Sequence, residues 1–148
     1  MTAPSAAPVL VLEDSDEDFD TLVEAGRHTN LHREFQRATT GDECLARLQA
    51  KQAKCLGPGI IMLDLNTSGM DGRETLAVIR SDNELPGIPV VVLSTSANPR
   101  DVSYCYANGA SAYHVKRVRY EQHLQLLRDI LSYWRGHVVP PEAAESLA

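Results

Sequence analysis

Three short apolar runs, each followed at once by a polar side chain, constrain the fold of this chain more than any other feature. Residues 9–12, 60–63 and 90–93 are apolar throughout, and they end at Glu13, Asp64 and Ser94. A run of about four apolar residues bounded by turn formers is typical of a strand that is buried on both faces. In open α/β sheets the carboxyl ends of the strands lie where ligands bind. We therefore expect these three polar residues to meet at one edge of a sheet.

Two weaker strand patterns complete a series of five, and helical patterns separate them. The weaker strands are residues 34–38 and 112–115, and Lys116 follows the second. The helical patterns cover residues 16–28, 42–54, 73–80, 99–108 and 120–134. This alternation with short connections predicts an α/β fold, a doubly wound parallel sheet of five strands with five helices on its two faces.

The size and charge of the chain are those of one globular domain. Its 148 residues are 43% hydrophobic and 23% charged, so we expect a domain over residues 8–135, a flexible lead-in of residues 1–7 and a tail of residues 136–148. The net charge of −6 argues against a nucleic-acid surface, and no apolar segment approaches the roughly 20 residues that a membrane span needs. Three cysteines without metal-ligand spacing are typical of free thiols in a reducing cytoplasm.

The acidic residues at the strand ends predict a metal site. Carboxylates that converge from neighbouring strands repel one another unless a cation joins them, and Mg²⁺ is a hard ion that prefers oxygen ligands. We expect Asp14 and Asp64 to bind Mg²⁺ directly and Glu13 to bind it through water. The backbone carbonyl of Asn66 is a candidate for a further ligand.

The same edge offers the groups that a phosphoryl transfer needs. A metal would neutralise a phosphoryl group arriving at Asp64, whose carboxylate could then act as the nucleophile. Lys116 would supply a positive charge to the phosphoryl oxygens, and Ser94 a hydroxyl donor. The product would be an aspartyl phosphate.

Four motifs, taken in order, resemble the receiver domain of two-component response regulators. They are the pair ED after the first strand, D-x-N-x-x-x-M-D-G from Asp64, VVVLSTS from Val90 and GASAYHVK ending at Lys116. The resemblance covers the chain from Val9 to Trp134. It implies a receiver (flavodoxin-like) fold with strand order 2-1-3-4-5, phosphorylation of Asp64 by a histidine kinase, and Mg²⁺ dependence.

The resemblance also implies a switch. Ser94 and Thr95 would lie against the phosphoryl group, and Tyr113 would move together with Ser94. A protein of this kind is a phosphoacceptor rather than an enzyme, since it catalyses only its own phosphorylation and dephosphorylation.

Two positions depart from the family pattern. The family often has proline four residues after the phosphorylated aspartate, where this chain has Ser68. It also usually has proline after its lysine, where this chain has Arg117. The proline of the family is often in cis, a specific backbone feature, so the loop after Val115 is expected to be held differently without it.

A narrower resemblance is to the regulators associated with phytochrome histidine kinases. It rests on D-L-N-x-x-G-x-D-G-R-E from Asp64 to Glu74, on the pair Tyr133-Trp134, and on the tail pattern of residues 138–140. Only 14 residues follow Trp134, which leads us to expect a single-domain regulator.

The last helical segment carries two apolar stripes, although a surface helix needs only one. One stripe is Leu124, Leu127, Leu131 and Trp134, and the other is Leu126, Ile130 and Tyr133. An exposed apolar strip often marks a protein contact. We therefore predict a homodimer through this helix, the fourth helix and the fifth strand, with contacts from Tyr104, His114, Leu126, Ile130, Tyr133 and Trp134. The alternative is a broad buried stripe in a monomer.

Other functions compete with this interpretation. A phosphatase of the haloacid dehalogenase type would need an acid two residues after its nucleophile, and Asn66 cannot be one. A flavin-binding relative would need a phosphate-binding loop where this chain has the acidic EDSDED from Glu13. A phosphorylation-independent interaction module on the same fold, and a phosphate sink for the kinase, remain alternatives.

Overall fold

Five parallel strands and five helices alternate along the chain in the computed structural model, which describes residues 7–29, 31, 33–53, 59–82 and 87–136. The strands are β1 (Val9–Leu12), β2 (Phe35–Ala38), β3 (Ile60–Asp64), β4 (Val90–Ser94) and β5 (Ala112–Val115). The helices are α1 (Asp16–His28), α2 (Gly41–Ala53), α3 (Gly72–Ser81), α4 (Pro99–Ala107) and α5 (Tyr120–Gly136). The predicted fold class is confirmed, and helix ends differ from the expected ones by one or two residues.

Some predictions fall outside the described residues. They concern the lead-in up to residue 6, the end of the second helix at residue 54, Cys55, the chain breaks at residues 57–58 and 86, and the tail from residue 137 with its pattern at 138–140.

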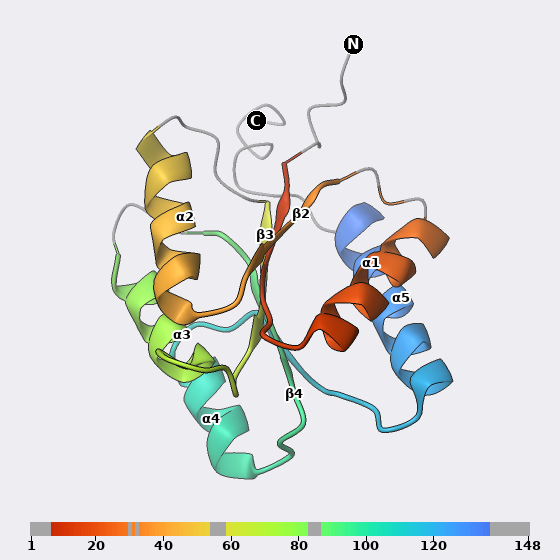
Figure 1. Ribbon diagram of the computed structural model, residues 1–148. Coiled ribbons are helices and arrows are strands. Elements are labelled where there is room, and N and C mark those ends of the chain that lie inside the picture. Colours follow the sequence, from red (N-terminus) through yellow and green to blue (C-terminus); the bar gives the residue numbers. More distant parts are fainter. Residues whose placement is uncertain (1–6, 30, 32, 54–58, 83–86, 137–148) are drawn as a thin grey trace.

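The sheet has the strand order β2-β1-β3-β4-β5, as the family resemblance implied, and helices cover both of its faces. Figure 1 shows α2, α3 and α4 on one side of the sheet and α1 and α5 on the other. Successive residues of a strand point to opposite faces, which explains why Leu10 packs under the three-helix layer while its neighbour Val11 packs under the two-helix layer. Each layer therefore has its own core.

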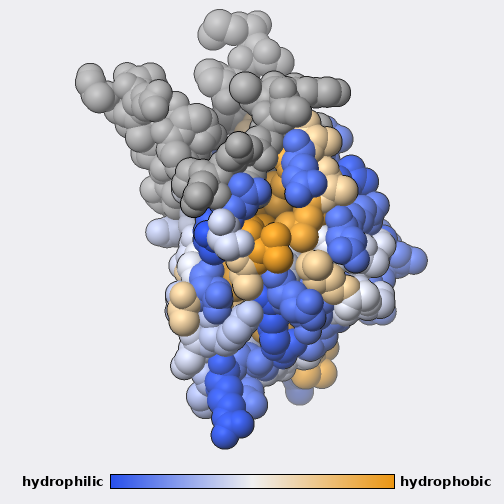
Figure 2. All heavy atoms as spheres, turned by 90° about the vertical axis from the view of Figure 1, so that its left-hand side faces the viewer, coloured by the Kyte–Doolittle hydropathy of each residue, from blue (hydrophilic) through white to orange (hydrophobic). Residues whose placement is uncertain are grey.

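The outer surface of the three-helix layer is mostly hydrophilic, with an apolar area near its centre (Figure 2). This polarity is typical of a helix layer that faces water on its outer side. No helix in the described part of the chain combines the length and the apolar character needed to cross a lipid bilayer.

The register of the strands brings the polar strand ends to one edge. Leu12 pairs with Leu63, so Glu13 and Asp64 both follow paired residues. Ser94 pairs with Val115, and the Lys116 N–H donates to the Ser94 carbonyl over 2.8 Å. The last residues of β3 and β4, Asp64 and Ser94, and the residues that follow β1 and β5, Glu13 and Lys116, thus lie at the same carboxyl edge of the sheet.

Candidate functional site

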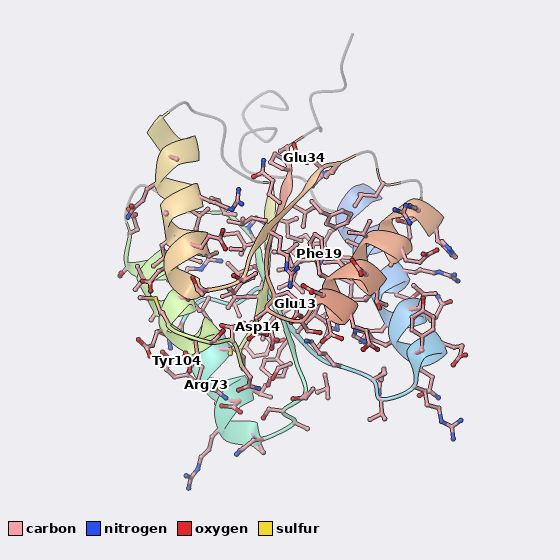
Figure 3. All side chains as sticks on the ribbon, viewed as in Figure 1. Glu13, Asp14, Phe19, Glu34, Arg73 and Tyr104 are labelled. Carbon is pink, nitrogen blue, oxygen red and sulfur yellow. The ribbon has the colours of Figure 1, made fainter. Side chains whose placement is uncertain are left out.

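Three carboxylates converge where β1 and β3 end. Glu13 and Asp64 are buried, whereas Asp14 is exposed, and one oxygen from each of the three lies within 4.8 Å of the others. Figure 3 shows Glu13 and Asp14 together at the end of β1. A set of three hard oxygen donors this close together suits a divalent cation.

The ammonium of Lys116 lies inside a ring of carboxylates. Its Nζ donates to Glu13 Oε1 at 2.8 Å, to Asp18 Oδ2 at 2.7 Å and to Asp64 Oδ2 at 3.3 Å. The Lys116 side chain is only 8% exposed. A buried ammonium requires such partners, because an unpaired buried charge is strongly destabilising.

The burial of this ring changes its protonation. Burial raises the pKa of Glu13 to about 7, against the opposing pull of the Lys116 ammonium. Burial alone would lower the pKa of Lys116, but the hydrogen bonds that its ammonium donates to Asp18 and Glu13 hold that pKa above its ordinary value. Lys116 is therefore charged at neutral pH, while Glu13 takes up a proton readily when no metal is bound.

The loop between β3 and α3 places Asp64. The Asn66 N–H donates to Asp64 Oδ1 at 3.2 Å, and the Asp71 side chain caps α3 by accepting from the Glu74 N–H. A Cβ on Gly72 would lie 2.1 Å from the Asp64 carbonyl oxygen, so only glycine fits there. Metal binding by the Asn66 carbonyl stays a prediction.

The two residues that stand in place of the family prolines both use their backbone N–H. The Ser68 N–H donates to Asp14 Oδ2 at 3.1 Å, and its Oγ lies 3.4 Å from the same atom. The Arg117 N–H donates to Nδ1 of the buried His123 at 3.3 Å. Burial lowers the pKa of His123, which keeps the ring neutral and able to accept this bond. Proline could make neither contact.

Ser96, which the sequence analysis did not single out, connects the predicted switch residues. Its N–H donates to Oγ of the buried Ser94 at 3.1 Å, and its carbonyl accepts from the Tyr113 hydroxyl at 2.7 Å. Its own Oγ donates to Asp101 Oδ2 at 2.6 Å on α4. The Thr95 side chain is exposed. Ser94 and Tyr113 are therefore linked through one intervening residue.

A second contact network joins α3 to α4 beside the site. The Arg73 guanidinium donates to Asp101 Oδ1 at 2.9 Å and lies 3.4 Å from the Asn66 side-chain oxygen. The Tyr104 hydroxyl donates to the Arg73 carbonyl at 3.2 Å. Both labelled residues lie on the α3 and α4 side of the site in Figure 3. The hydrogen bonds from Arg73 and Ser96 hold the pKa of Asp101 below its usual range.

The face formed by β5 and α5 differs from the prediction at one important position. Ile130 is only 3% exposed and packs in the core under α1 and α5, so little of its side chain is left at the surface. The helix turns this residue inward because it shares the core-facing side with Leu127 and Leu131. Tyr133 is 54% exposed and meets the Trp134 ring edge to face, with centroids 5.4 Å apart.

A hollow nevertheless lies over this face. It has a volume of about 380 Å³ and is lined by Ser111, Ala112, His114, Leu126, Asp129, Ile130, Tyr133 and Trp134. The half-buried His114 has a lowered pKa because of its burial and, to a smaller extent, the charge of Arg117.

Sequence reasoning missed Asp18, Ser96 and the pair of Arg73 with Asp101. Asp18 belongs to the acidic run from Glu13, where an acid in the first turn of a helix needs no further explanation. Arg73 and Asp101 are far apart in the chain and meet only because α3 and α4 are neighbours.

Comparisons with known proteins agree with this geometry. The matching family model is the response regulator receiver domain, over residues 9–128. Response regulator Rcp1 of Synechocystis sp. (strain ATCC 27184 / PCC 6803 / Kazusa) is 33% identical over 137 residues, which cover 91% of this chain and 93% of Rcp1.

Two solved structures superpose with a TM-score of 0.85. One is the phosphorylated cyanobacterial phytochrome response regulator RcpA, at 34% identity over 91% of this chain and 98% of that chain. The other is the Mn²⁺-bound form of response regulator Rcp1, at 32% identity over 91% of this chain and 99% of that chain.

Proposed function

Because this chain belongs to the response regulator receiver domains, we propose that it accepts a phosphoryl group from a sensor histidine kinase onto Asp64, with Mg²⁺ as the cofactor. The observation that carries the proposal is the convergence of Glu13, Asp14 and Asp64 around one site, with the ammonium of Lys116 beside them. A phosphoacceptor needs all four groups, and packing alone gives no reason to gather them.

Each residue has a defined part in the transfer. A carboxylate oxygen of Asp64 attacks phosphorus, the bond from phosphorus to the donor's histidine nitrogen breaks, and that nitrogen keeps the electron pair. Lys116 and the Ser94 hydroxyl donate hydrogen bonds to the phosphoryl oxygens. Asp14 and Asp64 directly, Glu13 through water and the Asn66 carbonyl would hold Mg²⁺, which would supply positive charge to neutralise the phosphoryl group.

We propose that phosphorylation is read through Ser94 and Tyr113, with Thr95 next to the phosphoryl group. Turning the Ser94 hydroxyl toward a phosphoryl oxygen competes with the bond that Oγ accepts from Ser96. The Ser96 carbonyl also accepts a hydrogen bond from the Tyr113 hydroxyl, so a change at Ser94 reaches β5 through one residue.

The kinase partner that we propose is of the phytochrome type. The support is the likeness to Rcp1 and to RcpA, which is described as a cyanobacterial phytochrome response regulator. We place the protein in the cytoplasm because Cys44 and Cys105 are buried free thiols, which persist in reducing compartments.

We also propose a homodimer, in which Ile130 is a minor contact because it is only 3% exposed. The surface would be the hollow between β5 and α5, with His114, Leu126, Tyr133 and Trp134, extended by the 38% exposed Tyr104 on α4. Light scattering at micromolar concentration tests it, with Tyr133→Glu as the disrupting variant. A parent protein that is monomeric both before and after phosphorylation would overturn the dimer proposal.

The test of the main proposal is the mass of the intact protein after incubation with Mg²⁺ and acetyl phosphate. We expect one phosphoryl adduct, which Asp64→Asn abolishes and a metal chelator prevents. Asp71→Asn is the matched control. It changes an acid in the same loop, and asparagine can replace Asp71 as the N-cap of α3. A parent protein that takes up no phosphoryl group would support the phosphorylation-independent module instead.

A further inference from the structure

Asp18 is a fourth carboxylate of the site, and it does not belong to the metal cluster. Among the described residues, the acids that could share one metal are Glu13, Asp14 and Asp64. Asp18 stands in the first turn of α1, and its Oδ2 is the nearest of the three carboxylate oxygens around Lys116 Nζ, at 2.7 Å. Its direct hydrogen bond to the site is the one that it accepts from Lys116.

The hydrogen-bonding capacity of Lys116 is fully used in this arrangement. An ammonium has three N–H donors and no acceptor. Lys116 gives one donor each to Glu13, Asp18 and Asp64. A phosphoryl oxygen at Asp64 can receive a hydrogen bond from Lys116 only if one of these three bonds is given up or shared.

The three bonds differ in what it costs to release them. The Glu13 and Asp64 side chains are 8% and 9% exposed, so water cannot easily replace the ammonium there. The Asp18 side chain is 35% exposed, and water can take the place of Lys116 at its carboxylate. The bond to Asp18 is the one that opens at the lowest cost.

We propose that Asp18 is a positioning residue that holds Lys116 in the resting protein and is the partner that Lys116 leaves when Asp64 is phosphorylated. This inference rests on the proposed function at Asp64. Asp18 then sets the balance between the unphosphorylated and the phosphorylated protein, because it competes with the phosphoryl group for one N–H of Lys116. Weakening Asp18 favours the phosphorylated state.

The experiment compares Asp18→Asn with two matched variants. Glu17→Gln removes the same charge from the same turn of α1 without a contact to Lys116, and Asp18→Glu restores a carboxylate. After incubation with Mg²⁺ and acetyl phosphate, we expect the phosphoryl group on Asp18→Asn to last about three-fold longer than on the parent. The effect is small because a partly exposed ion pair contributes little free energy. Glu17→Gln and Asp18→Glu should match the parent.

A second readout follows Lys116 itself. The sequence has lysine only at positions 51, 54 and 116, so the nitrogen-15 NMR signal of the Lys116 ammonium is assignable by one substitution. We expect the signals of the parent and Asp18→Asn to differ before phosphorylation and to coincide after it. A role of Asp18 in the helix alone would leave that signal unchanged.

The outcomes separate this inference from the proposed function. A parent without any adduct overturns the phosphoacceptor function. A phosphorylated parent whose adduct lasts as long as that of Asp18→Asn, or a Lys116 signal that still differs between the two proteins after phosphorylation, overturns the role of Asp18.

Discussion

The carboxyl edge of the sheet and the face formed by β5 and α5 are organised in different ways. At the edge, Glu13, Asp64 and Lys116 are nearly buried and each is bonded to partners from another element. On the face, Ile130 is buried but Tyr133 is exposed, although both belong to one stripe of α5. The sheet topology fixes the edge, whereas the face depends on how α5 is rotated against the sheet. Strand ends are therefore a stronger guide to function than helix stripes.

The largest expected effect is on stability, and it should distinguish the buried side of α5 from its exposed side. Ile130→Glu should lower the free energy of unfolding by about 4 kcal/mol, because it buries a charge without a partner. Tyr133→Glu should cost less than about 1 kcal/mol, since Tyr133 is 54% exposed. Urea unfolding at two protein concentrations measures both values and separates any contribution from association. Equal losses would mean that the two positions are equally buried.

The next largest effect is a pH dependence of stability, which tests the burial of the Glu13 carboxylate at the carboxyl edge. The pKa of Glu13 is raised from 4.5 to about 7, so between these values the folded protein binds more protons than the unfolded chain. The stability that Glu13 contributes is therefore complete below pH 4.5 and is lost as the pH rises through 7. The metal-free protein should lose at most about 3 kcal/mol of unfolding free energy over this range.

Two comparisons isolate the contribution of Glu13. Glu13→Gln should remove this part of the pH dependence, and Mg²⁺ should reduce it because the metal favours the charged carboxylate. Thermal or urea unfolding at pH 5, 6, 7 and 8 measures the slope. An unchanged slope in Glu13→Gln would show that other groups cause it.

The smallest effect concerns the loop that reaches across to Asp14. Ser68→Pro removes both donors to Asp14 Oδ2, whereas Ser68→Ala removes only the longer contact of 3.4 Å. We expect the proline variant to bind Mg²⁺ less tightly by a factor of less than about ten, the low end for groups that orient a metal ligand. Calorimetric titration measures this, and the alanine variant should stay near the parent. Tighter binding by the proline variant would show that Ser68 competes with the metal.

The sequence was sufficient for the fold and for the centre of the site for a physical reason. Apolar runs that end in Glu13, Asp64 and Ser94 are local patterns, and parallel pairing forces their ends together. Contacts such as Ser96 with Asp101, or Arg73 with Asp101, depend on side-chain directions and on the spacing of neighbouring helices. No local pattern encodes those, and the burial of Ile130 could not be predicted for the same reason.

Ser96 has a consequence for how such a chain can diversify. It bonds to Ser94 on β4, to Asp101 on α4 and to Tyr113 on β5. The bonds to Ser94 and Tyr113 use the backbone N–H and carbonyl of Ser96, so a side-chain substitution there directly removes only the bond to Asp101. The link from β4 to β5 is therefore expected to tolerate substitutions at this position that alter the contact with α4.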